Sequence, residues 1–360
     1  MLEMSDRIYI FGAHSRGRTF KAYINFLYPE TVVEAFIVDA IYENGQYIDG
    51  IAVKEIGKWM DTEVPVYIAT RGIYHEKIIE NLCAFGIKAI IPVTVNLDMQ
   101  LRNEYMRKFY EYNEKKFIKL KNLPLVSEQC KKKKAACVYV ATSIHDSMLQ
   151  EKYSLKSYEK RIQVGSALTE ERLENAEFDC IGDNISEKNR QYCELTGLYW
   201  IWKHAKEDYV GLCHYRRHFI LPDDWVDRME QNSIDVILPV PLYVAPNLED
   251  NFRGRHAARE WDCMMKYLQD NLPEDYESAK MFFKGNLYSP CNMLIAKKQV
   301  LDELCIWLFP ILDTVVAECG VEQDKYENRY PGFLSERLIT YFFESKQQYK
   351  VAYADKNFLK

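Results

Sequence analysis

Imidazole and guanidinium groups are concentrated in one short run of the sequence, GLCHYRRHF at residues 211–219. Burying several such groups is costly unless an anion compensates them. Arginine binds phosphate and carboxylate oxygens through two parallel hydrogen bonds, so adjacent arginines suit an anionic ligand. The run therefore predicts an anion-binding site, built from His214, Tyr215, Arg216, Arg217 and His218.

A strand is expected to position this run. Residues 210–217 have a β pattern, which would place His214 and Arg216 on one face and Arg217 on the other. His214 and His218 have the i, i+4 spacing of a helical metal pair. On a strand, however, four residues span roughly 13 Å, so a shared zinc ion is not expected.

A capped helix is expected before that strand. Asn184 and Glu187 have the N-x-x-E spacing of a capping box. Apolar residues recur on one stripe of residues 186–205, which predicts a helix with a core-facing side. The members of this stripe are Tyr192, Leu195, Tyr199 and Trp202.

The composition of the 360-residue chain limits the class of protein, and its length favours two domains. A formal net charge of −6 argues against nucleic acid as a partner, because nucleic-acid binding requires a basic surface. The aromatic share of 14 %, with 26 tyrosines, fits either a carbohydrate-binding cleft or ordinary core packing.

Cysteine usage and the N-terminal residues predict a cytoplasmic protein. The ten cysteines form neither a C-x-x-C pair nor a zinc spacing and mostly lie in apolar runs, as expected of reduced thiols. The first residues, MLEMSDRIYIFG, lack the pattern of a signal peptide. No window reaches the ~18 apolar residues that a membrane span requires.

Residues 1–96 alternate strand and helix patterns. RIYIF ends in Gly12, a helix pattern follows, and VVEAFIVD ends in Asp39, which outlines a βαβ nucleotide-binding unit. VPVYIAT, HEKIIENLCAFG and KAIIPV repeat the alternation, so a small parallel sheet with helices on both faces is expected. The glycine fingerprint is incomplete, because Gly12 and Gly17 lack the glycine between them.

This first domain resembles the Rossmann-like N-terminal domains joined to some bacterial sugar-modifying enzymes, through IYIFGAHSRGR, FIVD, GIAV and LCAFGIKAIIPV. The resemblance implies a domain that either binds a nucleotide sugar or serves only for packing. For a bound phosphate, the helix N-terminus would supply free N–H groups and a favourable dipole. The contacts would be Gly12, His14, Ser15 and Arg16.

Residues 97–134 are predicted to form a charged, helical connector that ends at Pro124. Leu101, Tyr105 and Phe109 share one stripe of this helix. Four consecutive lysines at residues 131–134 indicate either a solvated linker or a peripheral contact with anionic lipid, worth about 1 kcal/mol per charge.

Residues 135–360 carry the patterns of a second α/β domain. Strands are expected at ACVYVAT, DVILPV, NMLIAK and VAYADK, and helices at REWDCMMKYLQ, LDELCIWLFPIL and ERLITYFFES. SALTEERL is expected to enter a helix. Residues 330–332, Tyr-Pro-Gly, predict a turn before a helix capped by Ser335.

Four motifs of this domain carry a family resemblance: DNIS-x-x-N-x-x-Y-C-E-L-T-x-x-Y-W-x-W-K, G-L-C-H-Y-R-R-x-F, N-M-L-I-A-K and G-F-L-S-E-R-L. Together they strongly resemble the DUF4422 family over residues 136–355. Its members are bacterial proteins of capsule and exopolysaccharide gene clusters, taken to be GT-A-like glycosyltransferases, and some are assigned as galactofuranosyltransferases. The resemblance implies transfer of a sugar from a nucleotide diphosphate donor, such as a UDP-sugar, to a growing, lipid-linked glycan at the inner face of the membrane.

The resemblance also implies where the donor lies. In a GT-A core the first strand ends at the nucleotide, and a later strand end usually carries a D-x-D pair that holds a divalent metal on the diphosphate. GLCHYRRHF stands at that second place and holds no carboxylate, so Arg216 and Arg217 are expected to neutralise the diphosphate directly. No metal cofactor is expected, and Mn²⁺ recruited by Asp183 is the less favoured alternative. The residues expected at the nucleotide are Thr142, Ser143, His145 and Asp146.

Glu336, which follows Ser335 in an expected first helical turn, is the candidate base for the acceptor hydroxyl. A favourable charge at a helix N-terminus would explain the same position. Asp262 and Asp324 are weaker base candidates. Arginines 216 and 217 could instead pair with internal carboxylates such as Asp183 or Glu194. The other residues expected to contact substrate are Asn184, Asn189, Asn292, Ser335, His214, Tyr215 and His218.

Two other classes of function compete with a glycosyltransferase. One is a non-catalytic scaffold or sugar-binding subunit of polysaccharide assembly, which donor turnover would distinguish. The other is a nucleotide-sugar oxidoreductase or epimerase built on the first domain. The sequence argues against this last class, because it contains no complete G-x-G-x-x-G and no Y-x-x-x-K followed by a matching domain.

Overall fold

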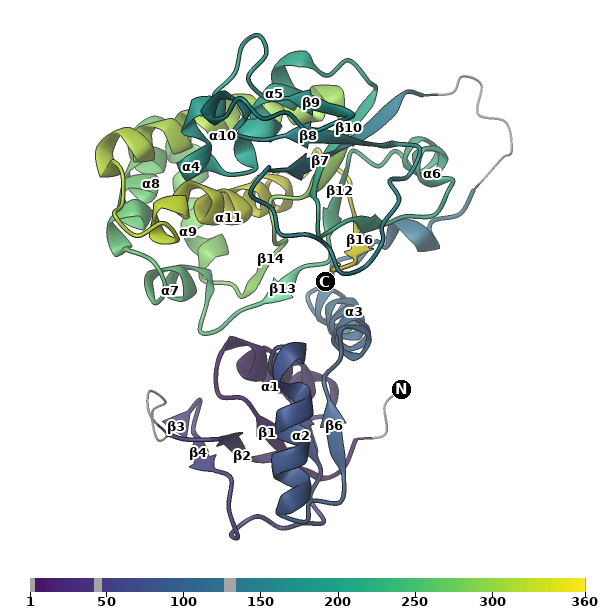
Figure 1. Cartoon of the computed structure of the whole chain (residues 1–360), viewed down its shortest axis with the longest axis vertical. Helices are drawn as coiled ribbons and strands as arrows, with labels where there is room; N and C mark the ends of the chain where they lie inside the picture. The colour runs from purple at the N-terminus through teal and green to yellow at the C-terminus, as the bar shows by residue number, and fades with distance from the viewer. Residues whose placement is uncertain (1–3, 42–46, 126–133, 360) are drawn as a thin grey trace. The chain divides into compact units, whose positions relative to one another are not determined.

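The computed structural model describes residues 4–41, 47–125 and 134–359 of the chain. The chain divides into two compact units, which are described separately (Figure 1). The N-terminal unit comprises Met1–Lys116 with Tyr243–Ala245, and the C-terminal unit comprises Phe117–Leu242 and Pro246–Lys360. In the described part of the chain, no helix is both long and apolar enough to cross a lipid bilayer.

The N-terminal unit contains a six-stranded sheet in the order β3-β4-β2-β1-β5-β6. All neighbouring pairs are parallel except the β3–β4 hairpin, so the predicted Rossmann-like parallel sheet is confirmed and the hairpin is an unpredicted addition. The strands are β1 (Arg7–Phe11), β2 (Val32–Val38), β3 (Tyr47–Ile48), β4 (Ile51–Glu55), β5 (Val66–Ile68) and β6 (Ile90–Pro92). The helices are α1 (Ser15–Leu27), η1 (Gly72–Tyr74), α2 (His75–Ala84) and α3 (Val95–Tyr112).

The glycine at position 17 has a packing role. A Cβ at Gly17 would lie 1.8 Å from the carbonyl oxygen of Gly12, so only glycine allows α1 to start this close to the end of β1. Phe20, Ile24 and Leu27 are buried, as the apolar spacing of α1 predicts.

The predicted helical connector is shorter than expected. Helix α3 ends at Tyr112 rather than at Pro124, and it packs on α1, with the rings of Tyr105 and Tyr23 separated by 4.9 Å between centroids. The apolar stripe of α3 is therefore part of a core. Of the lysine run, residues 131–133 lie outside the described residues, and Lys134 pairs with Asp208 at 3.1 Å.

The C-terminal unit is built on an eight-stranded mixed sheet in the order β11-β16-β12-β15-β10-β7-β8-β9. Helices α8 to α11 gather at one side of this sheet, and α6 lies at the other (Figure 1). The strands are β7 (Ala136–Thr142), β8 (Glu159–Gln163), β9 (Ala176–Phe178), β10 (Tyr209–His214), β11 (Phe219–Ile220), β12 (Val236–Pro239), β15 (Leu294–Lys297) and β16 (Val351–Lys356), and the short strands β13 (Leu242–Tyr243) and β14 (Leu287–Tyr288) form a separate pair.

The helical segments of this unit are η2 (Leu120–Asn122), η3 (Ser166–Leu168), η4 (Ser186–Lys188), α4 (Asn189–Tyr192), α5 (Leu195–His204), α6 (Trp225–Gln231), α7 (Leu248–Arg253), α8 (Ala258–Asn271), α9 (Pro273–Phe283), α10 (Lys298–Cys319), η5 (Glu327–Arg329) and α11 (Tyr330–Ser345). Strands and helices thus alternate around a sheet rich in parallel pairs. The predicted α/β fold class is confirmed for both units.

Three local predictions for the C-terminal unit were wrong. The helix expected over residues 186–205 is interrupted at Cys193, whose backbone has a φ of +49°. SALTEERL forms only the single turn η3. Residues 330–332 are the first turn of α11 rather than a preceding turn, because proline is tolerated at the first helical positions, where its missing N–H is not needed.

Candidate functional site

The carboxyl ends of strands β7 and β10 meet at one edge of the sheet. The two strands are parallel neighbours, with His214 paired to Ala141, and the Tyr215 N–H donates to the Ala141 carbonyl at 3.1 Å. The loop of residues 143–146 after β7 therefore lies beside the turn of residues 214–217 after β10. Adjacent strand ends of this kind are where open α/β sheets bind ligands.

The turn of residues 214–217 replaces the second half of the predicted strand. Strand β10 ends at His214, whose N–H donates to the Arg217 carbonyl at 3.0 Å, while the Arg217 N–H donates back to the His214 carbonyl at 2.9 Å. The chain turns here because pairing with β15 stops at Leu212 and pairing with β7 stops at His214. The prediction that Arg216 and Arg217 lie on opposite faces of a strand was therefore wrong.

Neither guanidinium of this turn forms an ion pair with a described residue. The Arg216 guanidinium lies 5.2 Å from the ring centroid of Tyr215, and that of Arg217 lies 5.3 Å from that of Phe358. The Arg216 Nε is buried without a hydrogen-bond acceptor. An unsatisfied buried donor costs about 1–3 kcal/mol, so the turn holds positive charge that an anion can stabilise.

The loop after β7 is closed by its own side chains. Asp146 accepts a hydrogen bond from the Ser143 N–H at 2.7 Å, Thr142 donates to the Val140 carbonyl at 3.1 Å, and His145 is exposed. Burial raises the pKa of the Asp146 carboxyl, although the Ser143 N–H and the Arg216 guanidinium both oppose this shift. The Asp146 carboxyl and the Arg216 guanidinium therefore interact electrostatically, because the two strand ends are adjacent.

The two histidines of the run have different partners. His214 donates from Nε2 to the Cys291 carbonyl at 2.6 Å. Burial lowers the pKa of His214, so the ring is neutral at pH 7 and its 3.9 Å approach to Glu194 is not a salt bridge. His218 instead bonds Glu159 through Nδ1 at 2.8 Å and stacks on Tyr153. The two rings therefore have different partners, and the strand spacing that argued against a shared zinc ion does not apply, because β10 ends at His214.

Glu159, Cys213 and His218 are the group in the described chain whose ligand atoms are close enough to suggest a metal ion. The 2.8 Å between Glu159 and His218 is a hydrogen-bond distance, shorter than the ~3.3 Å between two ligands of tetrahedral zinc. Burial also raises the pKa of the Cys213 thiol, which disfavours the thiolate that a metal requires. We interpret the group as a buried polar network beneath the turn of residues 214–217.

Glu336 lies in the second turn of α11, so its predicted position at a helix start was wrong. Its side chain is 16 % exposed, and it accepts a hydrogen bond from the Cys291 N–H. Burial raises the pKa of Glu336 to about 6, against the opposing effects of Arg337 and the Cys291 N–H. A carboxylate with this pKa is suited to general base catalysis near neutral pH.

Ser335 is not a helix cap. It is fully buried, and its hydroxyl oxygen lies 2.7 Å from the Asn292 side-chain carbonyl and 2.9 Å from the Gly332 carbonyl, which share its one proton. Asn292, also buried, donates from Nδ2 to Glu194 at 2.8 Å. Both residues belong to a buried polar network, and their contact with substrate stays a prediction.

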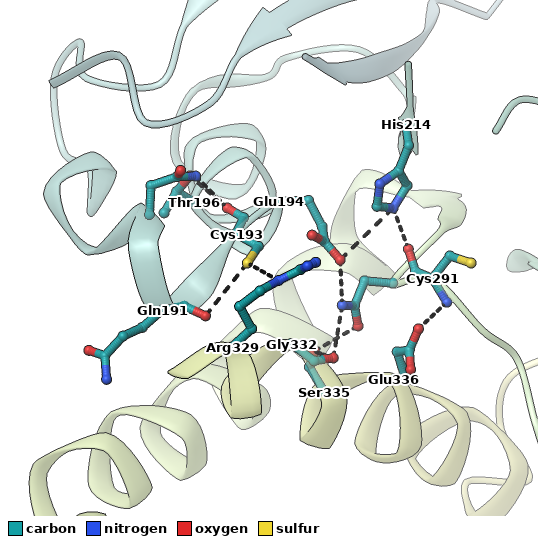
Figure 2. A network of polar contacts seen from close by, with 12 residues as sticks. Gln191, Cys193, Glu194, Thr196, His214, Cys291, Arg329, Gly332, Ser335 and Glu336 are labelled. Carbon is teal, nitrogen blue, oxygen red and sulfur yellow. Dashed lines mark hydrogen bonds and ion pairs between the residues drawn. The ribbon is translucent and has the colours of Figure 1, made fainter. Parts of the chain in front are cut away.

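Glu194 lies in the same polar network, although the sequence analysis did not select it as a site residue. Figure 2 shows the carboxylates of Glu194 and Glu336 and the ring of His214 turned toward the segment that contains Cys291. In the sequence analysis Glu194 was considered only as an ion-pair partner for Arg216 and Arg217, and Glu194 forms an ion pair with neither arginine. Its position depends on contacts between residues far apart in the chain, since Asn292 lies 98 positions away.

Other predicted contacts have local structural partners. The Asp183 side chain is 59 % exposed and pairs with Lys203 at 3.5 Å, away from the two arginines. Asn184 bonds the carbonyls of Cys180 and Gly182 and no capping box forms, whereas Asn189 bonds the Cys193 carbonyl. The weaker base candidates are engaged elsewhere, Asp262 by Arg253 and Asp324 by the N–H groups of Tyr326 and Glu327.

In the N-terminal unit, the predicted phosphate contacts surround the start of α1. Gly12 has a φ of +113°, and His14 is the N-cap residue but makes no side-chain cap hydrogen bond. Ser15 and Arg16 are exposed. Ligand binding at this helix start remains a prediction.

Comparison with solved structures gives the class of fold. The structure titled "WbbM bifunctional glycosytransferase apo structure" matches with a TM-score of 0.55 and 24 % identity, covering 63 % of this chain and 45 % of that chain. This chain thus spans less than half the length of WbbM, and the likeness shows a shared fold. A core-mannan synthase A (CmsA/Ktr4) from Aspergillus fumigatus, in its Mn/GDP form, matches at a TM-score of only 0.29, with 11 % identity over 67 % of this chain and 79 % of that chain.

The chain therefore shares an α/β fold with a solved glycosyltransferase structure, in agreement with the predicted fold class. Residues 137–348 match the family described as "Domain of unknown function (DUF4422)", and the chain belongs to this family. No curated protein sequence matches it.

Proposed function

We propose that the protein is a glycosyltransferase that moves a hexose from a nucleoside diphosphate donor to a hydroxyl group of a glycan. The observation that carries this proposal is the turn of residues 214–217, where two guanidinium groups that form no ion pair with any described residue lie beside the end of β7. A diphosphate would supply the missing negative charge. Because one fold serves many activities, the proposal rests on this site more than on the likeness to WbbM.

The chemistry assigns different roles to the arginines and to Glu336. As the acceptor oxygen bonds to the anomeric carbon, the bond from that carbon to the diphosphate oxygen breaks. Glu336 takes the proton of the acceptor hydroxyl, and with a pKa of about 6 it is ionised at pH 7 in about nine of ten molecules. Arg216 and Arg217 stabilise the charge on the departing nucleoside diphosphate.

We propose that this transfer does not depend on a divalent metal. A metal on the diphosphate would need carboxylates at the end of β10, where this chain places His214, Arg216 and Arg217. Carboxylates around this turn already have partners: Asp146 accepts from the Ser143 N–H, Glu159 bonds His218, and Glu336 accepts from the Cys291 N–H. These residues do not fit a cation such as Mn²⁺, whereas they fit direct neutralisation by arginine.

The proposal for the wider setting of the reaction rests on the resemblance of the sequence motifs. We propose a bacterial surface polysaccharide as the product, with a lipid-linked glycan acceptor, a galactofuranose donor as the first candidate, and a place at the inner face of the membrane. The N-terminal unit either binds a nucleotide sugar at the start of α1 or serves only for packing.

The experiment that tests the proposal combines binding with turnover. The full chain is screened by thermal shift against UDP-, GDP- and dTDP-sugars, and each stabilising donor is then assayed for release of the nucleoside diphosphate. A ligand at 100 times its dissociation constant stabilises the protein by about 2.7 kcal/mol, which a melting curve resolves. We expect stabilisation together with turnover. Stabilisation without turnover, with or without candidate glycan acceptors, would instead assign a sugar-binding subunit.

A further inference from the structure

We propose that Glu194 is a second functional carboxylate, whose free oxygen accepts a hydrogen bond from a sugar hydroxyl group in the same site. This inference rests on the proposed glycosyltransferase function and adds a substrate contact to it. The hydroxyl belongs either to the transferred sugar or to the acceptor glycan, and the experiment below distinguishes the two.

The first argument is the backbone around Glu194. The described chain contains seven non-glycine residues with positive φ, and three of them lie in this network: Cys193 at +49°, Cys291 at +79° and Asn292 at +50°. Such conformations cost of order 1–3 kcal/mol each and collect at functional sites, where the surrounding structure must hold them. The strain is concentrated where Glu194 meets the segment that contains Cys291.

The second argument is how the strained residue is held. Cys193 interrupts the helix between α4 and α5, and its Sγ lies 3.0 Å from the Arg329 Nε. Asn189 and Thr196 both donate to the Cys193 carbonyl, at 2.7 and 3.0 Å. Without this interruption residues 189–204 could form one continuous helix, as their periodicity predicts. The break therefore sets the direction of the next side chain, Glu194 (Figure 2).

The third argument is the fixed orientation of the partner amide. The Glu194 carboxylate and the Gly332 carbonyl can only accept hydrogen bonds, so the Asn292 atom that lies 2.8 Å from Glu194 Oε1 and 3.0 Å from the Gly332 carbonyl is the amide nitrogen Nδ2. The amide oxygen Oδ1 then accepts from the Ser335 hydroxyl. One oxygen of the Glu194 carboxylate is thus positioned by a buried relay of hydrogen bonds.

The fourth argument is that the second carboxylate oxygen of Glu194 is left open for a ligand. No described residue forms a hydrogen bond or an ion pair with Glu194 Oε2, and the side chain is only 13 % exposed. The neutral His214 ring beside it supplies no counter-charge, whereas the Arg329 guanidinium interacts with Glu194 electrostatically. Glu194 Oε2 is not among the fully buried atoms of the described chain that lack a partner, so a ligand can reach it, and a carboxylate can only accept hydrogen bonds. Sugar hydroxyls are donors of the kind that this oxygen can accept from.

The test uses the full chain with the donor that the wild-type protein turns over. Glu194→Gln keeps the shape and removes the charge, Glu194→Asp withdraws the carboxylate, and Glu187→Gln is the matched control, an exposed glutamate on η4. A charge-assisted hydrogen bond corresponds to about a 10- to 150-fold effect on affinity. We expect Glu194→Gln to raise one KM by a factor in this range, with an unchanged melting temperature and no effect of the control substitution.

Two assays locate the hydroxyl. Donor hydrolysis without acceptor gives the donor KM, whereas transfer at saturating donor gives the acceptor KM. Deoxy analogues of the affected sugar then identify the contact. With the wild-type protein, one analogue should raise the KM by the same factor as Glu194→Gln does. With Glu194→Gln, that analogue should raise the KM no further. A purely structural role of Glu194 would not produce this pairing between one side chain and one hydroxyl.

The failing results are distinct. If the wild-type protein turns over a donor and both Glu194 variants keep each KM within twofold, Glu194 has no substrate role and the glycosyltransferase proposal stands. If a variant only lowers the melting temperature, and no deoxy analogue pairs with it, the residue is structural. If the wild-type protein neither binds nor turns over any nucleotide sugar, the proposed function fails and this inference fails with it.

Discussion

Glu336→Gln is expected to stabilise the protein above pH 6 while reducing its activity. The folded structure raises the pKa of this carboxyl from 4.5 to about 6, because the side chain is buried. A raised pKa means that the folded state binds the proton more tightly than the unfolded state. The wild-type protein therefore loses stability as the pH rises from the unfolded to the folded pKa, by about 2 kcal/mol for a shift of ~1.5 units.

Glutamine mimics the protonated carboxyl at every pH. The difference in unfolding free energy between Glu336→Gln and wild type should be near zero at pH 4.5 and about +2 kcal/mol at pH 8. Urea unfolding followed by tryptophan fluorescence measures this difference, since five of the six tryptophans lie in the C-terminal unit. Glu174→Gln, at an exposed glutamate, is the control and should stay within about 0.5 kcal/mol. A Glu336→Gln variant that is no more stable than the wild-type protein at pH 8 would refute the burial of an ionised carboxylate at this position.

Two further predictions concern the reaction. If Glu336 is the base, kcat/KM should fall about tenfold for each pH unit below about 6, because a protonated Glu336 cannot accept the proton of the acceptor hydroxyl. The Glu336→Gln variant should have low activity without this decrease at acidic pH. The same decrease in the variant would assign the titration to another group. Turnover should also persist in EDTA, since cationic side chains occupy the end of β10, whereas strict dependence on added Mn²⁺ would overturn the metal-independent proposal.

Much of the fold could be predicted from local patterns. Strands β1, β2, β7, β15 and β16 coincide with runs of β-branched or aromatic residues, and helix α1 with an apolar stripe of helical spacing. Burial of such runs is decided mostly by their own sequence. The family resemblance placed residues 142–146 and the run of residues 214–218 at the same donor, and in the structure they follow parallel neighbouring strands that end at one edge of the sheet.

The details that shape the site depend on tertiary contacts. The break at Cys193 is held by Arg329, which is distant in sequence, so the periodicity of residues 186–205 indicates an uninterrupted helix. Strand β10 ends where its neighbouring strands stop pairing with it, and the residue types at positions 215–217 do not predict this end. For the same reason Glu194 was not singled out as a site residue. Glu336 was proposed as the base from an incorrect helix boundary, and its burial and raised pKa were not predicted.

The central claim is that Arg216 and Arg217 bind the diphosphate of the donor, and calorimetric titration in EDTA tests it most directly. The wild-type protein and the Arg216→Ala/Arg217→Ala variant are titrated with a nucleoside diphosphate and with the matching nucleoside, using Arg259→Ala, at an exposed arginine of α8, as the control. Each charge-assisted contact corresponds to about a 10- to 150-fold effect on affinity. We predict that the wild-type protein and the control strongly prefer the diphosphate, and that the double variant binds the two ligands about equally. An undiminished preference for the diphosphate in the double variant would contradict the claim.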